Sequence, residues 1–142
     1  MSTDAIQLDS LYREIDGLLA AKRIRGFRDG NHLLIRLYRS DRTQKIRLTQ
    51  KDGTFRFTSI VAKVKDVIPG GINARNDLLF RILRRNALKP VVALHIDAKD
   101  RIVGEVTCTT SSAHHAEIEF YLTTLARDCD RFEYILSGSD RN

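Results

Sequence analysis

The chain has 142 residues, of which 42% are hydrophobic and 30% charged, so it is long enough for one domain with its own core and too apolar to be disordered. No stretch approaches the roughly 18 consecutive apolar residues of a membrane span, and the N-terminus lacks the basic and apolar blocks of a signal peptide. The net charge of +6 is unevenly placed, with the basic part in the first half of the chain, and this asymmetry favours an anionic partner, such as nucleic acid, an acidic protein or a membrane surface, without choosing among them. We therefore expect one domain over residues 1–142 without a membrane span.

A first helix is predicted over residues 5–21, where apolar residues recur at intervals of three and four. Thr3 or Asp4 can cap its N-terminus, and residues 22–26 end it and open a basic region. Its apolar stripe consists of Leu8, Leu11, Ile15, Leu18 and Leu19.

Three strands are predicted next, because apolar and polar residues alternate over residues 32–39, 44–50 and 54–59. Tight turns at residues 40–42 and 51–53 join them into a β-meander. The alternation predicts one inward face, formed by Leu33, Ile35, Leu37, Ile46, Leu48, Phe55 and Phe57. Residues 60–68 fit either an extension of the third strand or a short helix, and the pattern leaves both open.

A second helix is predicted over residues 74–86, with Asn73 as its cap and Asn86 as its end, since Pro90 forbids its continuation. Its apolar residues are Leu78, Leu79, Ile82 and Leu83. These side chains can pack on the sheet or against a copy of the same helix.

Two further strands and a long helix complete the chain. Residues 91–97 and 101–109 alternate again, and residues 98–100 join them as a turn. A helix is predicted over residues 111–138, with Ser111 and Ser112 as N-cap residues. Its apolar stripe consists of Ile118, Leu122, Leu125, Cys129, Phe132 and Leu136.

The predicted element order is α-β-β-β-α-β-β-α. Strands joined by tight turns pair antiparallel, and helices gathered on one face of such a sheet characterise the α+β class. We therefore expect an α+β fold with a single antiparallel five-stranded sheet, whose apolar side is covered by the first and last helices.

Four segments carry a recognisable pattern: residues 83–86 end a helix at an asparagine, residues 92–97 and 101–105 form a hairpin that contains Ile-Asp, and residues 126–132 lie in the final helix. This arrangement resembles the YbjN-like proteins and the class I type III secretion chaperones, which share one fold, and the likeness extends over nearly the whole chain. The resemblance implies a protein-binding module without catalytic residues, with a chaperone- or regulator-type role, and often a homodimer. Secretion chaperones of this fold are usually acidic, so the basic charge of this chain makes the YbjN-like group the better match.

Metal ligands are present but do not form a recognisable site. His114 and His115 could approach a metal together with Cys108, yet adjacent histidines at a helix start point about 100° apart, and no second cluster completes four ligands. Cys108 and Cys129 are typical of core residues, and nothing in the sequence indicates an oxidising compartment. We expect no metal, no cofactor and a cytoplasmic protein.

Catalytic patterns are also lacking. Ser111 and Ser112 are typical of helix caps, and neither has a spaced base. Residues 69–71 precede a helix, but the Gly-Lys-Ser/Thr of a phosphate-binding loop does not follow. The sequence therefore predicts that the protein is not an enzyme.

The outward face of the meander is the strongest functional feature. Residues 22–65 hold 13 Lys/Arg against 3 Asp/Glu, and the alternation directs one arginine outward from each of three successive strands. Because like charges on neighbouring strands repel, such a face is either well solvated or meets an anion. The predicted partner-binding residues are Arg36, Tyr38, Lys45, Arg47 and Arg56.

Two partners fit this basic face. The main hypothesis is a protein partner, which can be acidic, and the alternative is nucleic acid held by phosphate contacts and stacking. The second helix supplies another basic patch, or a dimer contact, with Arg81, Arg84 and Arg85.

Overall fold

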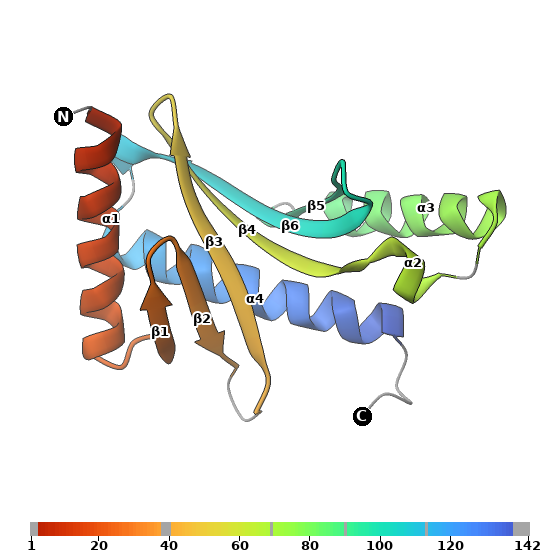
Figure 1. Cartoon of the computed structure of the whole chain (residues 1–142), viewed down its shortest axis with the longest axis horizontal. Helices are drawn as coiled ribbons and strands as arrows, with labels where there is room; N and C mark the ends of the chain where they lie inside the picture. Colours follow the sequence, from red (N-terminus) through yellow and green to blue (C-terminus); the bar gives the residue numbers. More distant parts are fainter. Residues whose placement is uncertain (1–2, 38–40, 69, 90, 113, 138–142) are drawn as a thin grey trace.

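The computed structural model of the chain describes residues 3–37, 41–68, 70–89, 91–112 and 114–137 (Figure 1). The elements are, in order, α1 (Thr3–Ala20), β1 (Gly26–Asp29), β2 (His32–Arg36), β3 (Thr43–Lys51), β4 (Thr54–Lys63), α2 (Val64–Val67), α3 (Ile72–Leu88), β5 (Ala93–Ile96), β6 (Arg101–Thr109), a 3-10 turn (Thr110–Ser112) and α4 (His115–Ser137). Within these residues, no helix combines the length and apolarity needed to cross a membrane.

The strands form one antiparallel sheet in the order β1-β2-β3-β4-β6-β5. The α+β class with an antiparallel sheet is therefore confirmed, but the predicted number of five strands is wrong, because the sheet has six. The strand that was not predicted is β1, which pairs with β2 across a two-residue turn in which Gly30 has a φ of 59°.

The alternation of apolar and polar residues does not predict β1, because the side chain that this strand directs inward is charged. Arg28 lies opposite the buried Leu33 and forms a bidentate ion pair with Asp16 of α1, with both N–O distances at 2.8 Å. Its guanidinium also lies 4.3 Å from the centre of the Tyr12 ring. The same guanidinium lowers the pKa of the Asp16 carboxyl. An ion pair attaches this strand to α1, so the strand lacks the apolar pattern from which a strand is predicted.

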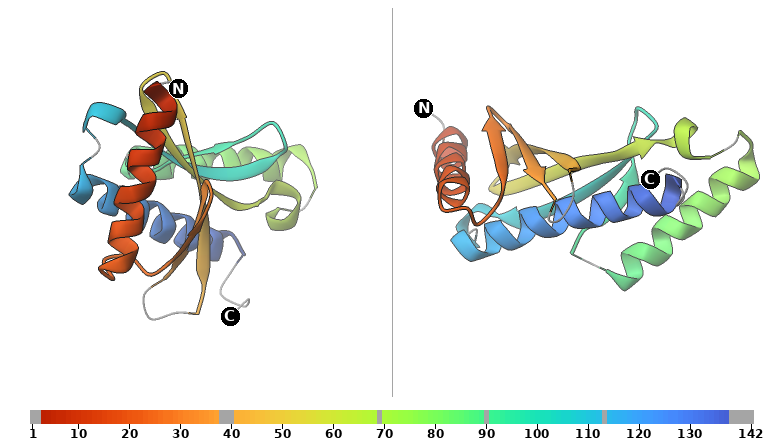
Figure 2. Two further views of the ribbon diagram at one scale, coloured as in Figure 1. Left: turned by 60° about the vertical axis from the view of Figure 1, so that its left-hand side comes forward. Right: turned by 90° about the horizontal axis from the view of Figure 1, so that it is seen from below.

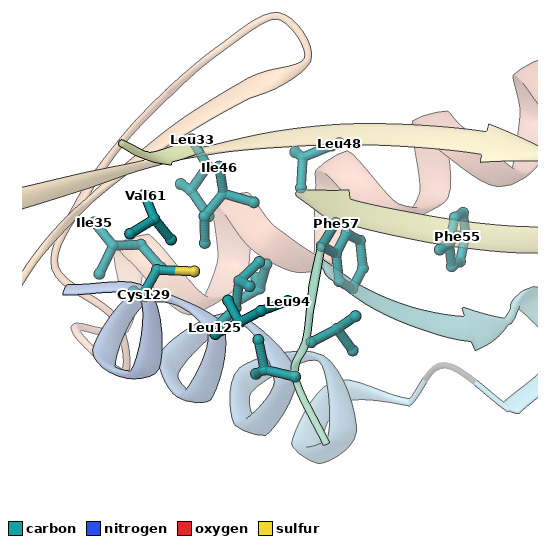
Figure 3. Close-up of a cluster of buried hydrophobic side chains, with 14 of the residues drawn as sticks. Leu33, Ile35, Ile46, Leu48, Phe55, Phe57, Val61, Leu94, Leu125 and Cys129 are labelled. Carbon is teal, nitrogen blue, oxygen red and sulfur yellow. The ribbon is translucent and has the colours of Figure 1, made fainter. Parts of the chain in front are cut away.

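The core lies between one face of the sheet and the helices α1, α3 and α4. α4 runs along one face of the sheet, and α1 lies at the end opposite α3 (Figure 2). The predicted inward residues of the meander are buried, except Leu37, which is partly buried. Figure 3 shows Ile35 and Ile46 on the face of the sheet that is turned toward Leu125 and Cys129 of α4. The predicted stripe of the last helix is likewise buried up to Phe132, with Leu136 partly buried.

The last helix begins later than predicted. α4 starts at His115, and Ser111 lies in the 3-10 turn that precedes it, so the predicted capping by Ser111 and Ser112 is wrong. The predicted end at Gly138 lies outside the described residues.

Residues 60–68 adopt both of the structures that the sequence left open. β4 continues to Lys63, with an irregularity between Ile60 and Ala62 in its pairing with β6. The single-turn helix α2 then follows at Val64.

The ends of α3 also differ from the prediction. Gly71 is the N-cap in place of Asn73, and the helix continues two residues beyond Asn86. The Asn86 amide instead donates to the Leu94 carbonyl at 2.9 Å and accepts from the Leu94 N–H at 2.8 Å. Because these are backbone groups of the edge strand β5, the side chain of Asn86 takes the place of a neighbouring strand.

Candidate functional site

The sheet face opposite α4 carries an open trough of about 600 Å³. It lies across β2, β3, β4, β6 and β5, and its residues come from the outward positions of these strands and from the turn between β5 and β6. The lining residues are His32, Lys45, Arg47, Thr49, Arg56, Thr58, Ile60, His95, Asp97, Lys99, Arg101 and Val103.

Three of the five predicted partner-binding residues line this trough: Lys45, Arg47 and Arg56. Arg36 is exposed on the same sheet face but lies outside the trough, because the register places it opposite Thr43, whereas Arg47 lies opposite His32. Tyr38 lies outside the described residues. The predicted arginines therefore share a face without forming a straight row across the strands.

Arg36 belongs to a second, smaller hollow of about 490 Å³ at the junction of α1 and β1. This hollow contains two more cationic side chains, Lys22 and Arg25, and the Phe27 ring, which is 58% exposed. The predicted basic residues of the meander are thus divided between two hollows.

Ion pairing divides the cations of the trough into two groups. Arg56 is paired with Glu105, and Arg101 donates to Asp97 at 2.8 Å. The Arg101 guanidinium lowers the pKa of the Asp97 carboxyl, which also accepts hydrogen bonds from the backbone N–H groups of Lys99 and Arg101.

The second group consists of Lys45, Arg47 and Lys99. None of these three side chains forms an ion pair with a carboxylate in the part of the chain that the structure describes. We call them the free cations of the trough. A positive group that is not neutralised within the protein remains available for an anionic group of a partner.

Sequence reasoning missed the far wall of the trough, which is formed by His95, Lys99 and Arg101 with Val103. Alternation over residues 91–97 and 101–109 already directs these strand residues outward. Their position beside the meander depends on the pairing of β4 with β6, in which Thr58 lies opposite Glu105. No local pattern in the sequence encodes that pairing.

The second predicted patch, on α3, is smaller than expected. Arg81 and Arg84 are exposed, but Arg85 is largely buried, and its Nη2 lies 2.7 Å from the Asp128 carboxylate of α4. Its Nη1 donates to the carbonyls of Lys89 and Val92. Arg85 therefore attaches α3 to the body of the protein and is not available to a partner.

α3 exposes apolar side chains as well. Leu78 and Ile82 are buried as predicted, but Leu79 and Leu83, predicted as part of the same stripe, are exposed. Leu83 is 64% exposed and the neighbouring Phe80 67% exposed. We call Ile72, Leu79, Phe80 and Leu83 the apolar face of α3.

Cys129 is a buried core residue, as predicted, and His115 pairs with a carboxylate of α1. Burial raises the pKa of the Cys129 thiol to about 12, which leaves it protonated and unreactive. His115 lies 2.9 Å from the Glu14 carboxylate on α1. Among the described residues, no group of three His, Cys, Asp or Glu side chains could hold a metal ion.

The fold is that of YbjN and the type III secretion chaperones, as the sequence resemblance predicts. No protein-family model matches the chain, and no curated protein sequence matches it significantly. A chain of the ExsC–ExsE complex aligns with a TM-score of 0.59 and 12% identity, over 98% of this chain and 99% of that one. YbjN from E. coli, a proposed transcription regulator, aligns with a TM-score of 0.56 and 13% identity, over 94% and 91%. A chain of the complex of the Yersinia pestis type III secretion chaperone SycH with a fragment of YscM2 aligns with a TM-score of 0.53 and 11% identity, over 82% of this chain and 94% of that one.

Proposed function

We propose that this protein is a single-domain, non-enzymatic binding module with a chaperone- or regulator-type role, and that a protein partner binds in the trough of its open sheet face. The observation that carries the proposal is the presence of three free cations in a trough that α1, α3 and α4 leave uncovered. Two of the structures with the same fold, ExsC–ExsE and SycH with YscM2, are complexes with a second protein.

The proposal includes a homodimer formed through the apolar face of α3. Phe80 and Leu83 are about two thirds exposed, so burying either side chain fully in a dimer contact would stabilise the dimer by about 1–2 kcal/mol. A two-fold axis would bring the same face of both copies together. The proposal also places the protein in the cytoplasm, where Cys108 and Cys129 stay reduced.

Reversing the charge of the three free cations tests whether the trough binds a protein partner. The variant combines Lys45→Glu, Arg47→Glu and Lys99→Glu, and its control makes the same charge change on α1, α2 and α4 with Arg13→Glu, Lys65→Glu and Arg131→Glu. Each protein is immobilised and incubated with a lysate of the cells that make it, with nuclease and at moderate salt.

We expect the wild type and the control to retain one protein in stoichiometric amount and the trough variant to lose it. Equal retention by the trough variant, or no retained protein at all, would contradict the proposal. Nuclease-sensitive material with strong absorbance at 260 nm would support the nucleic-acid alternative instead.

A further inference from the structure

The floor of the trough is apolar at its centre. Ile60 of β4 lies directly opposite Val103 of β6, and both side chains point to the outward face. Val103 is only 6% exposed, whereas Ile60 is 48% exposed. An apolar side chain placed on Ile60 would therefore remove apolar surface from water at this point.

The free cations lie on both sides of this floor. Lys45 and Arg47 come from β3, which neighbours β4 on one side. Lys99 comes from the turn between β5 and β6, on the other side. A bound chain that seats one apolar side chain on Ile60 thus meets positive charge both before and after it.

The width of the trough sets the length of the occupant. Four strand-to-strand steps separate β2 from β5, which at about 4.8 Å each gives about 19 Å. An extended chain advances about 3.3 Å per residue, so about six residues span the trough.

The chemistry of the lining favours a peptide over a nucleic acid. Bases are held on sheets by stacking on aromatic rings, and the described lining residues include no Phe, Tyr or Trp. An aliphatic floor between two sets of cations complements an aliphatic side chain between carboxylates.

We infer that the partner segment is an extended acidic stretch of about six residues, with one aliphatic side chain that sits on Ile60 and Val103 and with flanking carboxylates that pair with Lys45, Arg47 and Lys99. The inference rests on the proposed protein-binding function and specifies the partner that the trough selects. Arg56 and Arg101 contribute less to this recognition, because Glu105 and Asp97 already neutralise them.

Fluorescence anisotropy with labelled hexapeptides tests the inference. The first peptide has five glutamates and one leucine at an inner position, the second replaces the leucine with alanine, and the third replaces the glutamates with lysines. We expect the wild-type protein to bind the first peptide, to bind the second roughly tenfold more weakly and not to bind the third. Lys45→Glu combined with Arg47→Glu should weaken binding of the first peptide by roughly tenfold or more.

Ile60→Ser supplies a matched control, because it removes the floor and leaves the cations in place. It should weaken binding of the leucine peptide and leave binding of the alanine peptide unchanged. Absence of binding at about 1 mM, equal binding of the leucine and alanine peptides, or tighter binding of hexathymidylate than of any peptide would overturn the inference.

The two hypotheses fail in distinguishable ways. If the lysate yields a protein partner that the free cations retain but an excess of the leucine peptide does not displace, the partner segment has another chemistry and the proposed function stands. If no protein is retained, the proposed function itself is wrong.

Discussion

Replacement of Gly104 with alanine would test how closely α4 approaches the sheet. A Cβ atom at this position would lie 2.3 Å from Cys129 Sγ and 3.4 Å from a methyl carbon of Leu125. A separation of 2.3 Å is far inside van der Waals contact, and both elements are held in the core, so neither can move aside freely. Overpacking of this kind costs about 1–3 kcal/mol.

The backbone of Gly104 offsets part of that cost. Its φ lies outside the left-handed region, so alanine fits the strand and restricts the unfolded chain, which stabilises by about 0.4–1 kcal/mol. We expect the free energy of unfolding to fall by about 1–2 kcal/mol in Gly104→Ala, measured by urea denaturation.

A double-mutant cycle isolates the contact. Cys129→Ala removes the sulfur and alone costs about 1 kcal/mol, the value for one buried methylene-sized group. In the double variant, the free energy of unfolding should fall by about 1–2 kcal/mol less than the sum of the decreases in the two single variants, because the alanine at position 104 then occupies the space that the sulfur leaves.

Gly17→Ala is the control for this cycle. Gly17 lies in α1 with no atom within 4 Å of the added Cβ, so alanine should raise the stability by about 0.5–1 kcal/mol. Strict additivity of Gly104→Ala and Cys129→Ala would refute the close approach of strand and helix.

Two further predictions concern the dimer and the buried thiols. Leu83→Asp places a charge on the apolar face of α3 and should convert a dimer to a monomer in light scattering, whereas Arg81→Asp on the other side of the helix should not. A wild-type protein of monomer mass would contradict the dimer. Burial raises the pKa of Cys129 from 9.0 to about 12, so the native thiol should resist alkylation at pH 8 and react once urea unfolds the chain. As the pH rises, the thiol ionises in the unfolded chain before it does in the native protein, so the free energy of unfolding of the wild type should fall between pH 9.0 and about 12. In Cys129→Ala the free energy of unfolding should fall less steeply with pH, and equal slopes for the two proteins would contradict the raised pKa of Cys129.

The amino-acid pattern by itself determined most of the fold. Alternation along residues 44–50 and 54–59 and the stripe from Ile118 to Phe132 were sufficient to predict which side chains are buried, because burial selects apolar residues at the period of the element. β1 was missed for the same reason: its inward residue is Arg28, which is stabilised by Asp16 rather than by burial in an apolar layer. The exposure of Leu79 and Leu83 could not be predicted either, since a core and an interface between two copies require the same apolar residues.

For the candidate site, the amino-acid pattern determined which side chains point to the outward face of the sheet, and the tertiary structure decided which side chains lie beside one another on that face. Lys45, Arg47 and Arg56 were predicted to point outward, and they do. Three features of the site depend on the pairing of β4 with β6, which lie far apart in the chain. These are the positions of the outward side chains relative to one another, the ion pair of Arg56 with Glu105, and the position of Lys99 on the opposite wall of the trough. Alternation has a period of two residues and carries no information about which strand lies alongside. Only the folded sheet brings free cations to both sides of Ile60.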